Sequence, residues 1–224
     1  MRVVVPYTDR NPKTRLDPLL SERERRSFSR AMLRDVVAAV RTAGHDPELL
    51  VPSPIDVGAG TPRDGADGTR HGIPGDVPVT VDDRALTPAV NAALDRIGST
   101  VSELGVVMAD LAIATPTALR RLAGVGGDVA VAPGRGGGTN ALVVRDPAFS
   151  VDYHGASYRD HRATAERAGL SVGVVDSMRL AADVDEPADL AAVLLHGDGH
   201  AREWVVDAGI ELDTGGGRVD VVRG

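Results

Sequence analysis

The sequence predicts an α/β fold with three layers, in which helices flank a mostly parallel sheet. Strand and helix signals alternate along the chain, which is the pattern of parallel strands joined through covering helices. The strand signals are short apolar runs bounded by turn-forming residues, and the first of them, at 2–6, ends at a proline. A length of 224 residues is normal for one α/β domain, so we expect a single domain over residues 1–224.

A long amphipathic helix follows the first strand. Ser21 and Glu24 form a capping-box pattern, in which each side chain accepts a hydrogen bond from the backbone of the other residue. Apolar residues then recur at helical spacing from Phe28 to Val40. Gly44 is expected to end the helix, because glycine readily takes the left-handed conformation found just beyond helix C-termini.

The next segment contains a strand at 49–51, a long loop and a strand at 79–81. Residues 53–78 are rich in glycine, proline, aspartate and arginine and show little apolar periodicity. This composition predicts a long, mobile surface loop rather than a linker between two domains.

The remainder of the chain continues the alternation. Residues 104–108 are the clearest buried strand, and Asp110 lies at or just past its carboxyl end. Threonine–proline pairs at 87–88 and 115–116 each supply an N-cap and a first-turn proline for a helix. We expect those helices to end near 97 and 123. Two further helices are expected at 157–168 and 187–195, and strands are expected at 129–132, 141–144, 171–175 and 180–182. A short helix with a β-ribbon is expected after 200.

Composition excludes several classes of protein. The formal net charge of −7 argues against a general nucleic-acid-binding protein, because such proteins usually present a basic surface. No apolar run approaches the roughly 18 residues of a membrane span, and the N-terminal residues do not resemble a signal peptide. The absence of cysteine excludes disulfides, thiolate catalysis and cysteine-based metal sites. We therefore expect a cytoplasmic protein that binds neither nucleic acid nor membrane.

The loop after the first strand carries two cations, Lys13 and Arg15. In open α/β sheets, ligands bind beyond the carboxyl ends of the strands, which is where this loop begins. An ammonium acts on phosphate as a compact point charge, and a guanidinium acts as a bidentate fork. Two ordinary surface cations are the alternative interpretation. Lys13, however, is the only lysine in a chain whose other basic residues are all arginine, which favours a position that requires an ammonium.

Three carboxylates form a candidate metal site. Asp110, at the end of a buried strand, is well placed to hold Mg²⁺ against a nucleotide phosphate. Asp183 and Asp185 alternate along a segment that we expect to be extended, so their side chains would point to one side. The alternative is that these residues cap helices, as Asp185 or Glu186 would for a helix beginning at Pro187.

A glycine-rich stretch at 134–138 precedes Thr139 and Asn140. Its glycines would let backbone amides approach an anion, and the two side chains would add hydrogen bonds. The stretch is neither a Walker A loop nor a Rossmann fingerprint, because no Lys-Ser/Thr follows it and a strand comes next. A flexible hairpin connection is the alternative. Further along, Ser157 either caps a helix or helps to bind an anion at the start of that helix.

Taken in this order, the segments resemble the 2-phospho-L-lactate guanylyltransferase family of coenzyme F-420 biosynthesis, and the match runs nearly from end to end. The matching positions are 5–6, 12–16, 21–36, 91–94, 108–111, 137–142, Ser157-Tyr158 with His161, 183–185, Pro187 and 189–190.

The resemblance implies the nucleotide-diphospho-sugar transferase fold, which is Rossmann-like, and the conversion of GTP and 2-phospho-L-lactate into lactyl-2-diphospho-5′-guanosine and pyrophosphate. It also implies a role for each candidate residue. The nucleotide would be bound by Pro6, Lys13, Arg15 and Asn91, and its phosphates would be acted on by Lys13 and Arg15. Mg²⁺ would be held by Asp110, Asp183 and Asp185, and the acceptor would be bound by Gly138, Thr139, Asn140, His154 and Ser157. The only partners it implies are small molecules, and a homodimer is compatible with the sequence.

The sequence departs from the family pattern at two positions. Ala112 stands where the family often has proline, and His154 stands where it often has glycine. The second departure lies in the implied acceptor pocket, which leaves phosphoenolpyruvate or 3-phosphoglycerate as alternative acceptors. A non-catalytic nucleotide-binding module is a third alternative. The lone Lys13 together with three carboxylates favours an enzyme over such a module.

Overall fold

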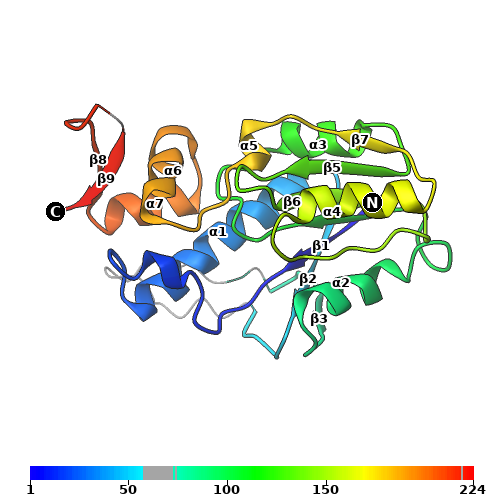
Figure 1. Ribbon diagram of the computed structural model, residues 1–224. Coiled ribbons are helices and arrows are strands. Elements are labelled where there is room, and N and C mark those ends of the chain that lie inside the picture. Colours follow the sequence, from blue (N-terminus) through cyan, green and yellow to red (C-terminus); the bar gives the residue numbers. More distant parts are fainter. Residues whose placement is uncertain (58–72, 74, 218) are drawn as a thin grey trace.

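The computed structural model describes residues 1–57, 73, 75–217 and 219–224 (Figure 1). Within these residues, one sheet contains the strands β1 Arg2–Pro6, β2 Asp46–Val51, β3 Val79–Val81, β4 Leu104–Val107, β5 Val129–Pro133, β6 Thr139–Val144 and β7 Val172–Val174. Their spatial order is β3-β2-β1-β4-β6-β5-β7. The order matters because it places the loops after β1, β4 and β5 at one edge of the sheet.

The sheet is mostly parallel, which confirms the prediction. Parallel pairs join β1 to β2 and β4, β2 to β3, and β5 to β7. Only β6 runs antiparallel to its two neighbours, β4 and β5. The glycine-rich stretch turns the chain back into β6, and Gly137 has a φ of 86° there, in the left-handed region that favours glycine.

Helices cover both faces of the sheet, as expected for three layers (Figure 1). The helices that do so are α1 Glu22–Thr42, α2 Leu86–Leu94, α3 Pro116–Gly124, α4 Ser157–Arg167 and α5 Met178–Ala181, whereas α6 Leu190–His196 and α7 His200–Asp207 lie beyond one end of the sheet (Figure 1). Val3 and Val5 of β1 pack in the cluster with α1, α3 and α5, whereas Val4 packs in the cluster with α2 and α4. This alternation follows from the two-residue period of a strand.

The signals at both ends of α1 are confirmed. The Ser21 hydroxyl accepts from the Glu24 backbone at 3.4 Å, and the Glu24 carboxylate accepts from the Ser21 backbone at 2.8 Å. Gly44 follows the helix with a φ of 88°. The predicted N-cap of α3 is confirmed as well, since the Thr115 side chain accepts from the Ala118 backbone.

A third apolar cluster joins the first half of α1 to α6, α7 and the ribbon of β8 Ile210–Asp213 and β9 Asp220–Arg223. These C-terminal elements lie together at one end of the molecule (Figure 1). Trp204 of α7 packs against Phe28 with ring centroids 5.1 Å apart, and its indole N–H donates to the Ser27 hydroxyl at 3.0 Å. The short helix and the ribbon were both predicted.

Four local predictions need correction. Helix α2 begins at Leu86 with Ala85 as its N-cap and ends at Leu94. Thr87 is therefore inside the helix, and its hydroxyl accepts from the Tyr153 backbone at 2.9 Å instead of capping. Strand β2 starts three residues earlier than expected. The strand expected at 180–182 is wrong, because a short apolar run does not distinguish strand from helix and this one forms α5.

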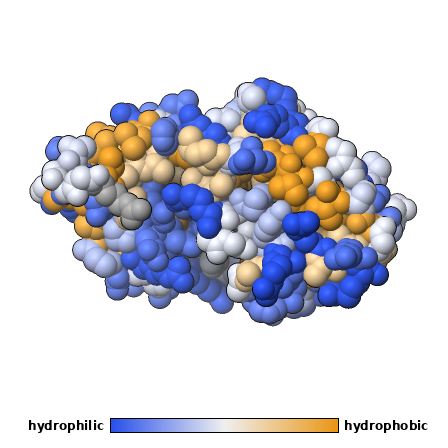
Figure 2. Space-filling view, turned by 45° about the horizontal axis from the view of Figure 1, so that its top comes forward, coloured by the Kyte–Doolittle hydropathy of each residue, from blue (hydrophilic) through white to orange (hydrophobic). Residues whose placement is uncertain are grey.

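Most of the loop expected at 53–78 lies outside the described residues. The described part contains Ile73 and Val77, which are buried, and a bridge between Val57 and Ile73. Pro54, Asp56 and residues 75, 76 and 78 are exposed, and the expectation of a long surface loop stays a prediction. No helix among the described residues has the length and apolar character needed to cross a membrane. Hydrophilic residues cover much of the face in Figure 2, in line with 25% charged residues, and apolar patches lie toward its two ends.

Candidate active site

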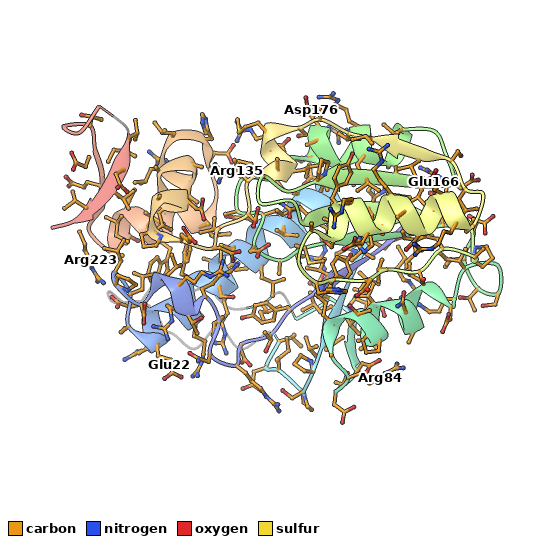
Figure 3. All side chains as sticks on the ribbon, in the orientation of Figure 1. Glu22, Arg84, Arg135, Glu166, Asp176 and Arg223 are labelled. Atoms are coloured by element: carbon orange, nitrogen blue, oxygen red, sulfur yellow. The ribbon has the colours of Figure 1, made fainter. Side chains whose placement is uncertain are left out.

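A cavity of about 720 Å³ opens at the carboxyl ends of β1, β2 and β4. The end of β1 contributes Pro6, the segment after β4 contributes Asp110, and the loop between β1 and α1 contributes Lys13 and Arg15. Arg84, just before the start of α2, also lines the cavity and is labelled in Figure 3. The position agrees with the rule that open α/β sheets bind ligands beyond their strand ends.

Lys13 is the centre of the charged part of this cavity. Its ammonium lies 2.6 Å from Asp110 Oδ2 and 2.8 Å from Asp185 Oδ1, and only 13% of its side chain is exposed. Burial by itself would lower the pKa of Lys13, but the charges of the two carboxylates and the hydrogen bonds to them outweigh it and raise the pKa above its ordinary value. Lys13 is therefore a permanent cation, held between two acidic groups.

The loop around Lys13 has a specific conformation. Lys13 itself has a left-handed backbone, with φ 52° and ψ 48°, which is uncommon for a residue other than glycine. The short 3-10 turn Thr14–Leu16 follows, and Leu16 is fully buried. On the other side, the buried Arg25 of α1 donates to the Pro12 carbonyl at 3.2 Å. Helix α1 therefore braces the loop that presents the ammonium.

Asp110 has one carboxylate oxygen in use and one free. Oδ2 accepts from Lys13, whereas Oδ1 is buried without a hydrogen-bond partner among the described residues. Burial raises the pKa of Asp110, an effect that the charge of Lys13 opposes. A buried, unpartnered carboxylate oxygen beside a cation has the chemistry of a magnesium ligand. The residues present therefore fit a metal ion that would share Asp110 with Lys13.

Asp183 and Asp185 lie beside Asp110 but have different partners. The Val184 backbone N–H donates to the Asp110 carbonyl at 3.2 Å, which brings this segment next to β4. Asp185 contacts Lys13, whereas Asp183 accepts from the Asn140 amide at 3.0 Å. Across residues 1–57, 73, 75–217 and 219–224, no three His, Asp or Glu side chains are grouped as ready metal ligands. The three-carboxylate magnesium site therefore stays a prediction.

The main chain of Asp185 is held by Asp189. Asp189 Oδ2 accepts from the Asp185 and Glu186 backbone at 2.9 and 2.8 Å, and its Oδ1 accepts from Arg135 at 2.8 Å. Arg135 belongs to the glycine-rich loop and lies between α5 and α6 in Figure 3. This network connects the glycine-rich loop to the carboxylate that faces Lys13.

Thr139 and Ser157, two of the expected acceptor residues, are in direct contact. The Thr139 backbone N–H donates to the Ser157 hydroxyl at 2.9 Å, and both residues are buried. The Thr139 hydroxyl lies 2.9 Å from Nδ1 of His161, which is itself buried. Gly138 adjoins them, since a Cβ at that position would lie 3.9 Å from the Ser157 hydroxyl.

Two other expected residues have different surroundings. The side chain of His154 is 74% exposed and its ring contacts Asp152. Asn91 uses both ends of its amide on the Val151 backbone, at 3.0 and 2.8 Å, and so braces the segment that leads to α4. Their roles toward substrate stay predictions, and the observed contacts of Asn91 are structural.

Several residues that line the cavity were not predicted from the sequence. Tyr7 and Arg10 line the cavity from the loop after β1, and Asp82 and Arg84 line it from the segment before α2. For Tyr7 and Asp82 the available signal was their position directly after β1 and β3. No sequence pattern indicates that Arg25 supports the loop around Lys13, because this contact depends on how α1 packs.

Solved structures of other proteins share this fold. The structure is similar to a Desulfovibrio desulfuricans protein described as a nucleotide-diphospho-sugar transferase, with a TM-score of 0.64 and 18% identity over 86% of this chain and 85% of the other. It is also similar to a nucleotidyl transferase of Methanothermobacter thermautotrophicus, with a TM-score of 0.55 and 16% identity over 87% and 96% of the two chains. The chain therefore has the α/β fold of these transferases, as predicted.

Sequence comparison identifies the family. The chain belongs to the family described as guanylyl transferase CofC like, whose model matches residues 1–222. It is 55% identical to the 2-phospho-L-lactate guanylyltransferase of Haloferax volcanii, over 100% of this chain and 98% of that protein. It is 52% identical to the enzyme of the same name from Haloarcula marismortui, over 100% and 99% of the two chains. The resemblance drawn from the sequence is confirmed.

Proposed function

We propose that this protein transfers the GMP group of GTP to 2-phospho-L-lactate, and that the products are lactyl-2-diphospho-5′-guanosine and pyrophosphate. The observation that carries the proposal is the Lys13 ammonium between Asp110 and Asp185, at the strand ends that line the cavity. Full-length relatives named for this reaction, at 55% and 52% identity, support the choice of substrates. The proposed location is the cytoplasm, where GTP is available.

The reaction brings two anions together. An oxygen of the acceptor phosphate attacks the α-phosphorus of GTP in line, a new P–O bond forms, and the bond from the α-phosphorus to the leaving pyrophosphate breaks. A phosphate monoester has a second pKa of about 6, so its attacking oxygen is already deprotonated near neutral pH. The site therefore needs positioning and charge neutralisation rather than a general base.

Lys13 and Arg15 supply the positive charge in this proposal. Lys13 would act on the triphosphate as a point charge from a fixed position, because two carboxylates hold its ammonium. The side chain of Arg15 is 68% exposed, and its guanidinium makes a long ion pair of 3.9 Å with Asp185. The guanidinium can therefore turn toward phosphate oxygens. Pro6 lines the same cavity.

Asp110 and Asp185, with Asp183 beside them, are the residues that would hold Mg²⁺. The ion would neutralise charge on the phosphates as a Lewis acid when bound. Asp110 offers its unpartnered Oδ1 for this purpose. Thr139 and Ser157 would hold the acceptor with their hydroxyl groups, and Gly138 and Asn140, which lie beside them, would contribute to that part of the site.

The test is pyrophosphate release with GTP and Mg²⁺ at high salt, with 2-phospho-L-lactate, phosphoenolpyruvate and 3-phosphoglycerate compared as acceptors. We expect release to be fastest with 2-phospho-L-lactate. Release dominated by another acid would replace the acceptor and keep the transfer of GMP. Measurable GTP binding without release for any of the three acids would show that the protein is not this enzyme.

A further inference from the structure

His161 lies in the second turn of α4, with 1% of its surface exposed. Its Nε2 lies 2.9 Å from the Asp152 backbone nitrogen, and its Nδ1 lies 2.9 Å from the Thr139 hydroxyl oxygen. The ring also packs edge-on against Tyr153 and Phe149, with centroids 5.1 and 6.0 Å away. Both ring nitrogens are therefore engaged, and the orientation of the ring is fixed.

These contacts determine the tautomer of His161. A backbone N–H can only donate, so Nε2 must accept from Asp152 and carry no hydrogen. A neutral imidazole then has its hydrogen on Nδ1, and Nδ1–H must donate to the Thr139 hydroxyl oxygen. Burial supports the neutral state, because it lowers the pKa of His161 to about 4.

The tautomer in turn determines what Thr139 can do. Its oxygen accepts from His161, so its hydroxyl hydrogen has to find another acceptor, and the described residues provide none. Ser157 is in the same state, because its oxygen accepts from the Thr139 backbone N–H. Two neighbouring hydroxyl groups, both buried, are thus left with hydrogens to donate. Such a pair matches a ligand with anionic oxygens, and two hydroxyls that accepted instead would repel it.

We propose that His161 is a positioning residue for the acceptor: by donating from Nδ1 it keeps Thr139 a hydrogen-bond donor toward the phosphate or carboxylate oxygens of the substrate. The inference rests on the proposed function, because it takes Thr139 and Ser157 as the acceptor site. His161 itself does not touch the substrate.

Two near-isosteric variants separate the two bonds of the ring. In His161→Asn the amide nitrogen takes the place of Nδ1 and still donates to Thr139. In His161→Gln the amide reaches the place of Nε2 and can still accept from Asp152, but nothing donates to Thr139. We expect His161→Gln to raise the KM for the acceptor about tenfold, with the KM for GTP unchanged, and His161→Asn to stay within about threefold of the wild type.

A double-mutant cycle with Thr139→Val tests the route of the effect. If His161 acts through Thr139, adding His161→Gln to Thr139→Val causes little further loss. Additive losses, or equal rises in the KM for GTP, would show that His161 only stabilises the fold. Should Thr139→Val and Ser157→Ala both leave the KM for the acceptor unchanged in an active enzyme, the placement of the acceptor would be wrong, whatever His161 does.

A measurement on the wild-type protein needs no variant to fold. ¹⁵N chemical shifts of the His161 ring report which nitrogen carries the hydrogen. We expect Nδ1 to be protonated and Nε2 to be bare at neutral pH. The opposite tautomer would overturn the proposal, because Thr139 would then donate to His161 and not to the substrate.

Discussion

The Lys13 ammonium lies 2.6 Å from Asp110 Oδ2, although the two residues are 97 positions apart in the chain. Parallel strands β1 and β4 are neighbours in the sheet, so the segments that follow them meet at one edge. The single lysine of the chain thus reaches a partly buried carboxylate whose second oxygen has no partner among the described residues.

Replacement of Lys13 should abolish most activity, and arginine should not restore it. The ammonium fits between two carboxylates within 2.8 Å, and a planar guanidinium is too large to take the same place. We expect kcat/KM to fall by about 100-fold or more in both Lys13→Ala and Lys13→Arg. Steady-state kinetics measure this, with Arg15→Lys as the exposed control expected to lose less than about tenfold. Full activity of Lys13→Arg would contradict the requirement for a compact charge.

Asp110→Asn should remove turnover but leave the fold intact. Asparagine keeps the shape of aspartate and loses the charge that a magnesium ion and Lys13 both require. We expect kcat to fall by about 1,000-fold, with a thermal midpoint close to that of the wild type. The exposed Asp207→Asn is the matched control and should change neither quantity. A near-normal rate in Asp110→Asn would remove this residue from the proposed metal site.

Gly134 and Gly136, both in the glycine-rich loop at 134–138, should respond differently to substitution by alanine. A Cβ on Gly134 would lie 2.5 Å from Asn140 Oδ1, whereas a Cβ on Gly136 would meet nothing within 4 Å. Gly134→Ala must displace Asn140, whose amide donates to Asp183. We expect at least about tenfold lower kcat/KM and a lower thermal midpoint for Gly134→Ala, and near wild-type behaviour for Gly136→Ala. Equal effects of the two substitutions would contradict this account of the loop.

Glu24 should make stability depend on acid pH. Its hydrogen bond to Arg223 of β9 lowers the pKa of Glu24 from 4.5 to about 2. A depressed pKa in the folded state gives stability that is present above pH 4.5 and is lost as the pH falls toward 2. Glu24→Gln can still complete the capping box but carries no charge.

We therefore expect Glu24→Gln to be less stable than the wild type by about 1 kcal/mol at pH 7, after allowance for solvent screening, and equal to it near pH 2. Chemical denaturation at fixed salt measures the difference. A difference that does not change with pH would mean that the charge of Glu24 contributes nothing.

His161 should make stability depend on pH in a higher range. Burial lowers its pKa from 6.5 to about 4, so the unfolded chain binds the proton more readily than the folded protein between these values. Stability is fully present above pH 6.5 and is lost as the pH falls toward 4. We expect the free energy of unfolding to decrease by about 2 kcal/mol between pH 7 and 4.5 relative to that of His161→Asn. An identical pH profile for the two proteins would exclude this titration.

Much of the fold could be read from local patterns. The capping box at Ser21, the glycine after α1 and the threonine cap of α3 act within a few residues, so their sequence neighbourhood is sufficient to predict them. Helix α5 could not be predicted in this way, because a short apolar run is compatible with either element. The start of α2 was misplaced for a related reason: the Thr87 hydroxyl is used by the distant Tyr153 backbone.

In the site, too, some features follow from local sequence patterns and others depend on contacts between distant segments. Residue type and position after a strand were enough to single out Lys13 and Asp110, because in a parallel sheet strand ends mark where ligands bind. Asp185 was singled out by its alternation with Asp183 along a segment that was expected to be extended. That Lys13 bridges the two carboxylates, that Asn91 serves the main chain, and that His161 sets the donor role of Thr139 depend on contacts between segments from 22 to 172 residues apart. Such contacts are made when the helices pack on the sheet, because burial and hydrogen bonding there select partners that no local pattern specifies.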